Sequence, residues 1–234
     1  TSLTAGELKS ALDQIKDSMS QQAGASEDAF RGVIEIDATS GSSEMINKTE
    51  VSIPKSSLGA MADEANVSVS IQTDLGTLTL DPAVLAQLAQ LSGGTLSISL
   101  EIADESLLSE EERQLAGGRP IMDISLMIDD KPITGFGGRT ILAGIPYKAT
   151  GTENGNNLIV MYMDGPDKGK PVKLSLYNGE SGEMLLRTGH LSLYGVGYRE
   201  VAFTDTNSHW AKASIEFLAA RDIRADDRGS EVDL

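Results

Sequence analysis

One short stretch combines residue types that can do chemistry on the chain itself. His190 is followed by Leu191 and Ser192, so an imidazole stands two residues before a hydroxyl. The imidazole can take the proton of Ser192, and the freed oxygen can attack the carbonyl carbon of Leu191. Water then hydrolyses the resulting ester, which cuts the backbone between Leu191 and Ser192. The pattern predicts a candidate self-cleavage site with His190 as base and Ser192 as nucleophile.

The elements around this stretch must hold the scissile bond under strain and must aim hydrogen-bond donors at the developing oxyanion. A strand pattern begins at the hydroxyl, because Ser192, Tyr194, Val196 and Tyr198 share one face by period-two alternation. A structural role is the alternative. Three-residue motifs often match by accident, and a histidine that enters a strand is usually a surface or capping residue.

The stretch 190–196 resembles the proteolysis site of the GAIN domain, the self-cleaving module of adhesion receptors. That family reads His-Leu-Thr or His-Leu-Ser, then a small residue, an aromatic and a short apolar strand. The run 158–164, LIVMYMD, matches a second family feature, an apolar and aromatic strand that ends in aspartate. The resemblance covers about residues 30–198 and implies a small helical part, then a β-sandwich whose last strand follows the cut. The family's cysteines and tryptophans are missing here.

A second resemblance lies further along the chain. Residues 203–223 resemble the opening half of an S-layer homology repeat, the module that anchors bacterial surface proteins to cell-wall polysaccharide. The matching residues are Phe203, Asp205, His209, Trp210, Ala211, Ile215, Leu218 and Ile223, with Asp222 where the family usually has glycine. We expect a helix here with an apolar stripe, capped by Asp205 or Ser208. We expect Trp210 to be a packing anchor.

The S-layer resemblance implies a place outside a bacterial cell, at its surface. The match stops at Ile223, and the family's second half, which contacts the wall polymer, is absent from the sequence. The implied partners are therefore other domains of the same surface protein. Wall polysaccharide would be bound only through full repeats, which this chain lacks.

Composition narrows the function further. Of the 234 residues, 40% are hydrophobic, and 35 acidic against 19 basic residues give a formal charge of −16. Such a chain buries an ample core, and its charge argues against nucleic acids and anionic membranes as partners. There is no cysteine, which excludes disulfides and thiolate metal sites. No run approaches the roughly 18 apolar residues of a membrane-spanning helix.

The order of patterns predicts an α+β chain that is mainly β. Residues 4–20 read as a helix with a Thr4–Glu7 capping box, and 102–119 read as partly helical with a Ser109–Glu112 box. From Pro120 onward, short strands alternate with turns, as in an antiparallel β-sandwich. We predict three parts: a helical segment and linker at 1–28, a GAIN-like sandwich at 29–200, and a partial repeat with a polar tail at 201–234.

A weak internal repeat lies inside the first half. Each copy reads strand, short helix, strand, with Pro54 and Pro82 near the helix starts. The equivalent pairs are Val51 and Leu78, Ile53 and Leu80, Leu58 and Leu85, Met61 and Leu88, Val67 and Leu96, Val69 and Ile98, and Ile71 and Leu100. We expect one sheet that carries two short covering helices.

Other candidate sites fail on their residue types. The loop 164–169 lacks the alternating oxygen ligands of a calcium loop. His190 and His209 are too few for a zinc site without cysteine, unless carboxylates join them. The glycines at 135, 137 and 138 do not precede a helix, so they form no phosphate cradle. No carboxylate spacing singles out a glycosidase pair. We therefore predict no metal and no cofactor.

Three functions remain open at this point. The first is a non-catalytic extracellular module that spaces or presents other domains of a surface protein. The second is a GAIN-like domain that cuts itself between Leu191 and Ser192, which would be its only enzymatic activity. The third is a module that binds a partner protein or a glycan, for which the sequence singles out no residue.

Overall fold

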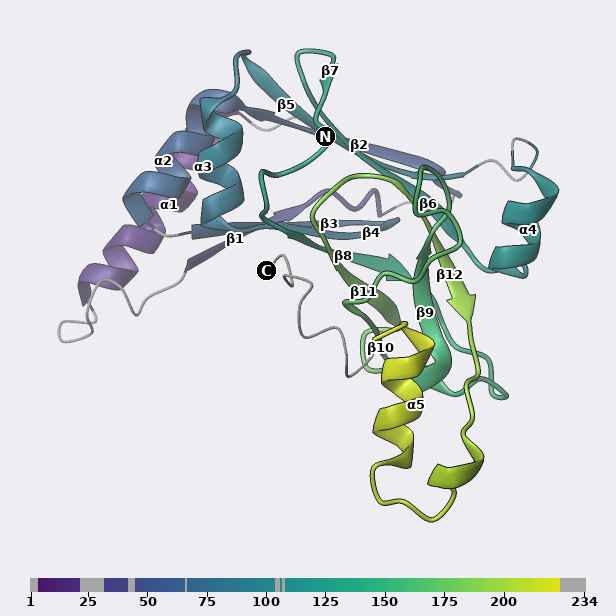
Figure 1. The fold of residues 1–234 in the computed structure, drawn as a ribbon. Helices are drawn as coiled ribbons and strands as arrows, with labels where there is room; N and C mark the ends of the chain where they lie inside the picture. Colours follow the sequence, from purple (N-terminus) through teal and green to yellow (C-terminus); the bar gives the residue numbers. More distant parts are fainter. Residues whose placement is uncertain are drawn as a thin grey trace. The chain divides into compact units, whose positions relative to one another are not determined.

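A computed structural model describes residues 4–21, 32–41, 45–65, 67–103, 106 and 108–223 of the chain (Figure 1). Within these ranges the fold is α+β, with two six-stranded, mostly antiparallel sheets and five α-helices. A helix stands near each end of the chain. The predicted fold class, a mainly β, two-sheet architecture with terminal and short covering helices, is confirmed.

The strands divide between the sheets as follows. The first sheet has the order β1 (Gly32–Asp37), β3 (Val67–Thr73), β4 (Gly76–Leu80), β8 (Ile141–Pro146), β11 (Glu183–Thr188) and β10 (Ser175–Asn178). The second has the order β2 (Lys48–Pro54), β5 (Thr95–Ile102), β6 (Ile121–Ile128), β12 (Leu193–Tyr198) and β9 (Leu158–Tyr162), with β7 (Lys131–Pro132) paired to β6. The β1–β3 pair is parallel.

Three of the helices begin at a side-chain cap, at Thr4, Asp81 and Ser109. They are α1 (Ala5–Gln21), α2 (Lys55–Ala65), α3 (Pro82–Gln90), α4 (Glu110–Ala116) and α5 (Lys212–Ala220), with 3-10 turns η3 (Gly155–Asn157) and η4 (Thr204–Thr206). Both predicted capping boxes are confirmed. The Glu7 carboxylate accepts from the Thr4 N–H at 2.9 Å, and Ser109 and Glu112 cap α4 reciprocally. Gly117, with φ of 58°, ends α4.

The chain forms two compact units. Unit 1 consists of residues 1–100, 125–141 and 189–191, and unit 2 consists of residues 101–124, 142–188 and 192–234. The three-part division predicted from the sequence stays a prediction, and its linker around 22–28 and its polar tail from 224 lie outside the described residues.

Unit 1 contains the internal repeat. Both copies fold as strand, helix and strand: β2, α2 and β3, then β4, α3 and β5. The expectation of one sheet is wrong, because β2 and β5 belong to one sheet while β3 and β4 form a hairpin in the other. Each helix therefore connects strands of different sheets. The alternation of apolar residues fixes which face of a strand is buried, and it does not say which strand lies beside it.

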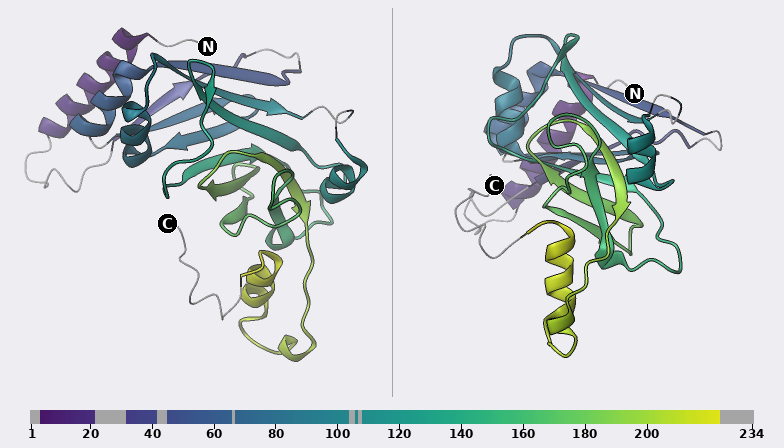
Figure 2. Two further views of the ribbon diagram at one scale, coloured as in Figure 1. Left: turned by 45° about the horizontal axis from the view of Figure 1, so that its top comes forward. Right: turned by 45° about the vertical axis from the view of Figure 1, so that its right-hand side comes forward.

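The helices of unit 1 pack side by side. Helix α2 contacts α3 on one side and α1 on the other (Figures 1 and 2). Leu58 of α2 and the equivalent Leu85 of α3 are both fully buried. Met61 and Leu88, three residues further along each helix, are at most 1% exposed. The repeat's apolar positions thus form the core that these helices cover.

Unit 2 contains β8 to β12 with α4 and α5. Its helices share one apolar cluster with β9, made of Leu108, Ala116, Ile121, Ile159, Met161, Met163 and Ala220. Strand β12 pairs with β9 from Tyr194 opposite Tyr162 to Tyr198 opposite Leu158, and its start pairs with β6. This pairing fixes the register of the strand that follows the predicted cut site.

Candidate functional site

The predicted site residues lie just before β12. His190 forms an isolated antiparallel bridge with Gly135, and Leu191 and Ser192 belong to no helix or strand. Strand β12 begins at Leu193, one residue later than the predicted strand. His190, Leu191 and Ser192 are all partly buried. His190 and Leu191 belong to unit 1, and Ser192 belongs to unit 2.

The hydroxyl of Ser192 has a carboxylate partner in unit 2. Ser192 Oγ donates a hydrogen bond to Asp164 Oδ1, and the Leu193 N–H donates to the same oxygen at 3.1 Å. Asp164 follows β9, and the Met163 N–H donates to the Leu193 carbonyl at 2.8 Å. Asp164 thus follows the end of the β9–β12 ladder and accepts a hydrogen bond from the candidate nucleophile.

The sequence pattern predicts a site made of His190, Leu191 and Ser192, and Asp164 is not part of that prediction. Asp164 was identified only as the last residue of the run 158–164, with no role in the site. The contact depends on β9 pairing with β12, whose paired residues stand 32 to 40 positions apart in the sequence. Nothing local in the sequence fixes that pairing, so only the family resemblance gave a signal.

The backbone on either side of the Leu191–Ser192 bond has no left-handed residue. The described non-glycine residues with positive φ are Asp129, Asp130 and Asp222, and neither Leu191 nor Ser192 is among them. The strain that self-cleavage requires is therefore not stored as a left-handed φ on either side of the bond.

Tyr194 anchors the strand behind the site. Its side chain is fully buried, and its hydroxyl shares a 2.9 Å hydrogen bond with Thr188 Oγ1. The ring lies against Tyr162, with centroids 5.6 Å apart. Burial raises the pKa of the Tyr194 phenol, so the hydroxyl stays protonated at neutral pH. Tyr194 therefore positions β12 and supplies no base.

A second polar group of unit 2 surrounds Glu153. Its carboxylate accepts from Arg119 Nη2 at 2.7 Å, from the Tyr147 hydroxyl at 2.7 Å and from the Thr150 N–H at 2.9 Å. Burial raises the pKa of Glu153, but the hydrogen bonds from Tyr147, Thr150 and Arg119 together lower it to about 2. With both oxygens engaged by the protein, this carboxylate has a structural role.

The segment that resembles an S-layer homology repeat is held by Arg221. Its side chain is fully buried just past the end of α5. The guanidinium donates to the carbonyls of Ser175, of Asn156 at 3.0 Å, of Leu158 at 2.8 Å and of Phe217 at 3.0 Å. It also lies 3.5 Å from the centroid of the Phe217 ring. Burial lowers the pKa of Arg221 to about 10, so the group stays cationic at neutral pH.

Two expectations for this segment are wrong. Helix α5 has Ala211 at its N-cap with no side-chain hydrogen bond, so neither Asp205 nor Ser208 caps it. Trp210 is 92% exposed and stacks on His209, with ring centroids 5.6 Å apart, so it is no packing anchor among the described residues. The sequence cannot place Trp210 because it lies in a turn, where helical periodicity gives no direction.

Asp222, just past the end of α5, has a left-handed backbone. Its φ is 54°, in the left-handed region where glycine is at no disadvantage and aspartate is tolerated. Its carboxylate also forms an ion pair with Arg199 at 2.8 Å. Aspartate therefore takes the left-handed conformation at position 222.

Metal-ligand clusters and membrane-spanning helices are both absent from the described residues. Across the described ranges, no three histidine, aspartate or glutamate side chains come together in a way that could hold a metal ion. None of the helices in those ranges has the length and hydropathy to cross a membrane. Comparison of the chain with family models, with curated proteins and with solved structures gave no match.

Proposed function

We propose that the chain is a non-catalytic extracellular module of a bacterial surface protein, and that it holds the segment 203–223 in a fixed orientation. The observation that carries this proposal is the burial of Arg221. A guanidinium is charged, and its transfer into a protein costs free energy unless its donors form hydrogen bonds there. A flexible tether would leave such a residue in water.

The partners of Arg221 tie α5 to the β-rich part of unit 2. Three of its four carbonyl partners, those of Ser175, Asn156 and Leu158, belong to β10, η3 and β9. Arg199, just past β12, adds its ion pair with Asp222. The segment after β12 therefore returns to the strands and is fastened to them at its far end.

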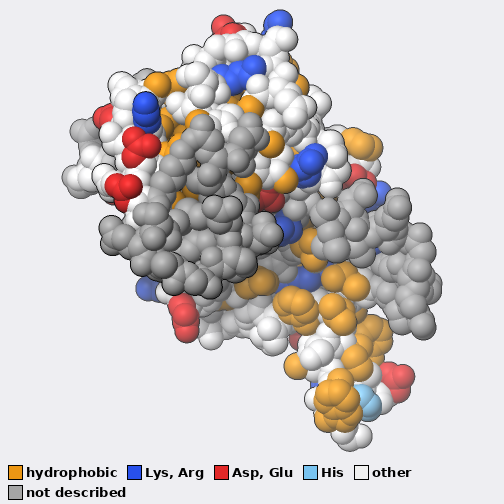
Figure 3. Space-filling view, turned by 90° about the vertical axis from the view of Figure 1, so that its left-hand side faces the viewer, with side chains coloured by type: hydrophobic (Ala, Val, Ile, Leu, Met, Phe, Trp, Pro, Cys, Tyr) orange, Lys and Arg blue, Asp and Glu red, His pale blue; other side chains and the backbone are white. Residues whose placement is uncertain are grey.

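The same segment exposes apolar side chains. Trp210, Leu218 and Phe203 are 92%, 41% and 38% exposed. Figure 3 shows hydrophobic side chains gathered on the lower part of the molecule, where α5 lies. A cluster of this kind is typical of a surface that another domain covers. This supports a module that presents its final helix to a neighbouring domain of the same surface protein.

The rigidity can be tested with the only tryptophan of the chain, Trp210. Time-resolved fluorescence anisotropy of the intact chain should show the indole tumbling with the whole of unit 2, apart from fast motion of the ring. Arg221→Met should add a nanosecond segmental component, and Arg187→Met, which changes an exposed arginine of the same unit, should not. A large segmental component in the unmodified chain would contradict the proposal.

The cellular location needs its own experiment. Intact cells that produce the parent protein should bind an antibody raised against residues 101–223 without permeabilisation, and brief protease treatment of the cells should remove that signal. If the epitope becomes accessible only after lysis, the extracellular assignment is wrong, whatever the behaviour of Trp210.

A second candidate function is self-cleavage between Leu191 and Ser192. The observation that favours it is the hydrogen bond from Ser192 Oγ to the Asp164 carboxylate. That carboxylate polarises the hydroxyl, and the family resemblance supplies an aspartate at the same place. His190 would then take the proton as the Ser192 oxygen attacks the Leu191 carbonyl.

The mass of the denatured chain decides between the two functions. The intact polypeptide has a mass of 24.7 kDa, and cleavage would yield residues 1–191 and 192–234 as separate species. Ser192→Ala should abolish the cut, and His190→Gln and Asp164→Asn should slow it. One full-length species after long incubation would eliminate this candidate and leave the structural module unaffected.

A further inference from the structure

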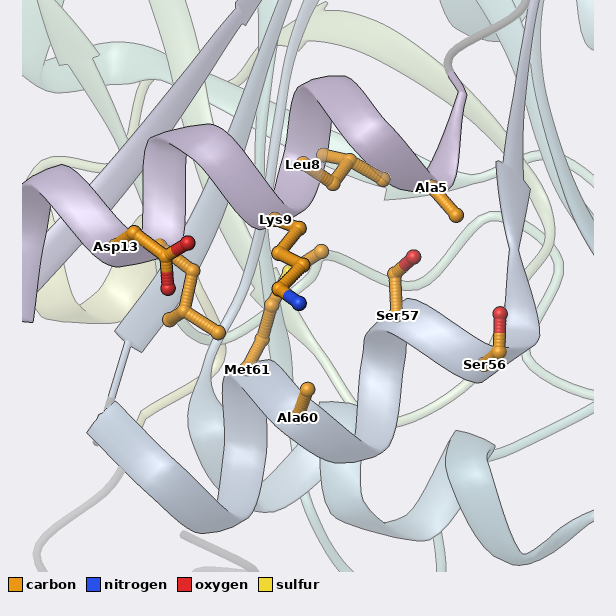
Figure 4. A pocket seen from close by; sticks show the side chains of 9 residues that line it. Ala5, Leu8, Lys9, Asp13, Ser56, Ser57, Ala60 and Met61 are labelled. Atoms are coloured by element: carbon orange, nitrogen blue, oxygen red, sulfur yellow. The ribbon is translucent and has the colours of Figure 1, made fainter.

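We propose that the groove between α1 and α2 in unit 1 binds a small amphiphilic anion, specifically an alkyl carboxylate. The groove encloses a cavity of about 320 Å³ (Figure 4). That volume lies at the lower end of the range for small-molecule sites in proteins, which is about 300–1,000 Å³. The ligand class follows from three features of its lining: an apolar floor, an open hydroxyl and an uncapped helix start.

The floor of the groove is apolar. Leu8 and Leu12 of α1 are 3% and 4% exposed, and Met61 of α2 is 1% exposed. Ala5 and Ala60 complete this part of the lining. Because the alanine side chains on both helices are small, space remains between α1 and α2 above the buried Leu8, Leu12 and Met61. An alkyl chain in this space would lose its contact with water without disturbing the core.

A buried hydroxyl opens into the groove. Ser57 is 9% exposed, and within the described part of the chain its side chain has no hydrogen-bond partner. Figure 4 shows the oxygens of Ser57 and Ser56 directed from α2 toward the α1 side of the groove. The Ser57 oxygen is accessible from the groove, because no buried side-chain nitrogen or oxygen of the described residues lacks a partner. It can therefore donate a hydrogen bond to a ligand acceptor in the groove.

The internal repeat shows what is missing at the start of α2. In the second copy, Asp81 caps α3, and its Oδ1 accepts from the Val84 N–H at 2.8 Å. The equivalent residues of the first copy are Pro54 and Ser57. Proline has no side-chain acceptor, so the protein supplies a carboxylate at the start of α3 and none at the equivalent place on α2.

The charges along the groove favour a carboxylate at the serine end. The first turn of α2 carries the positive end of the helix dipole, and the ammonium of Lys9 lines the groove opposite it. Asp13 lies one turn further along α1, toward the other end of the groove (Figure 4). Repulsion from Asp13 therefore orients the ligand with its head at Ser56 and Ser57 and its alkyl chain over Leu8, Leu12 and Met61.

Octanoate is the probe for this site, with 1-octanol as the uncharged control of the same length. Titration into the ¹⁵N-labelled full chain should shift the amide signals of Ser56 and Ser57 in a saturable way, and octanol should bind at least fivefold more weakly. Pro54→Asp copies the Asp81 cap into α2, adds no bulk to the groove and should weaken octanoate binding at least tenfold. Lys9→Gln should weaken it about threefold, and Lys131→Gln, a matched change on the exposed β7 turn, should not.

Each other outcome would overturn the proposal. Equal affinity of octanoate and octanol would show an apolar groove without anion recognition. Unchanged octanoate affinity in Pro54→Asp and Lys9→Gln would place the ligand elsewhere. Absence of saturable shifts at these amides up to tens of millimolar octanoate would leave no site at all. The Asp81-bearing start of α3 serves as an internal control, since its amide signals should stay fixed in every titration.

Discussion

Ser57 in unit 1 and Arg221 in unit 2 are both nine-tenths buried or more, yet the structure treats them in opposite ways. The guanidinium of Arg221 donates to four carbonyls. The hydroxyl of Ser57 has no partner in the described part of the chain. A buried polar group that the protein satisfies completely fastens elements together. A buried polar residue without a partner in the protein is available to a ligand. The structural proposal depends on the first kind of residue, Arg221, and the ligand proposal depends on the second kind, Ser57.

Substitution of Arg221 should have the largest effect on stability. Arg221→Met should lower the free energy of unfolding by about 3 kcal/mol, because several buried carbonyls lose their donor together. Arg221→Lys should recover only part of the loss, since one ammonium has three donors and cannot reach all four carbonyls. Urea unfolding monitored by circular dichroism measures both variants.

The matched change Arg187→Met, on an exposed arginine of the same unit, should stay within about 0.5 kcal/mol of the unmodified chain. If Arg221→Met were equally mild, the burial of its guanidinium would not be what holds α5. The structural proposal would then lose its support.

The Glu153 carboxylate is a second polar group that the protein satisfies completely, and its contribution to stability should depend on pH. The pKa of Glu153 is lowered to about 2 in the folded chain from 4.5 in the unfolded one. A depressed carboxyl pKa stabilises the fold fully above pH 4.5, and this stabilisation is lost as the pH falls toward 2. We expect a loss of about 2 kcal/mol over this window from Glu153 alone.

Urea unfolding at several pH values between 5 and 2.5 should show this loss. Glu153→Gln should be less stable than the unmodified chain at pH 6 and should have a flatter acid dependence. Glu180→Gln, on an exposed turn, should leave the slope unchanged. A slope that Glu153→Gln does not alter would mean that other carboxyls dominate acid unfolding.

The two repeat helices allow a smaller and more local test. Asp81→Ala should destabilise the chain by about 1 kcal/mol, because the first turn of α3 loses its cap. Ser57→Ala should stay within about 0.5 kcal/mol of the unmodified chain, because it removes a hydroxyl that has no partner. Thermal unfolding of both single variants measures the contrast. A Ser57→Ala chain as unstable as Asp81→Ala would show that the hydroxyl is already satisfied.

What the sequence reveals about this molecule depends on how far apart the interacting residues stand. The Thr4–Glu7 and Ser109–Glu112 boxes span three residues each, and both were predicted with their helices. The repeat predicted strand, helix, strand twice, because alternation and helical spacing are local. The assignment of its strands to two sheets was missed, since pairing partners are set by the packing of the whole chain.

The candidate sites follow the same rule. His190, Leu191 and Ser192 are adjacent and were found by their types, but Asp164 joins Ser192 across 28 positions. The carbonyl partners of Arg221 on β9, β10 and η3 stand 46 to 65 positions away. Every residue has a backbone carbonyl, so no sequence motif could have predicted which carbonyls Arg221 contacts. Long-range contacts with the main chain are the part of a site that a single sequence does not reveal.

The smallest expected effect concerns Asp222, beside Arg221. Asp222→Gly should remove the cost of a left-handed φ for a residue with a side chain, a gain of up to about 1 kcal/mol. It should also remove the ion pair with Arg199, whose two side chains are 43% and 42% exposed, and exposed pairs contribute roughly 0–1 kcal/mol. The two terms oppose each other, so the free energy of unfolding should change by less than about 0.5 kcal/mol.

Salt separates the two contributions to Asp222→Gly. At high ionic strength the ion pair is screened in the unmodified chain, while the backbone strain is not. The glycine variant should therefore become the more stable of the two as sodium chloride rises from 0.05 to about 1 M. A salt-independent difference would mean that the Arg199–Asp222 pair contributes nothing, and that Arg221 and the hydrogen bond from Arg199 to the Ala220 carbonyl fasten the end of α5.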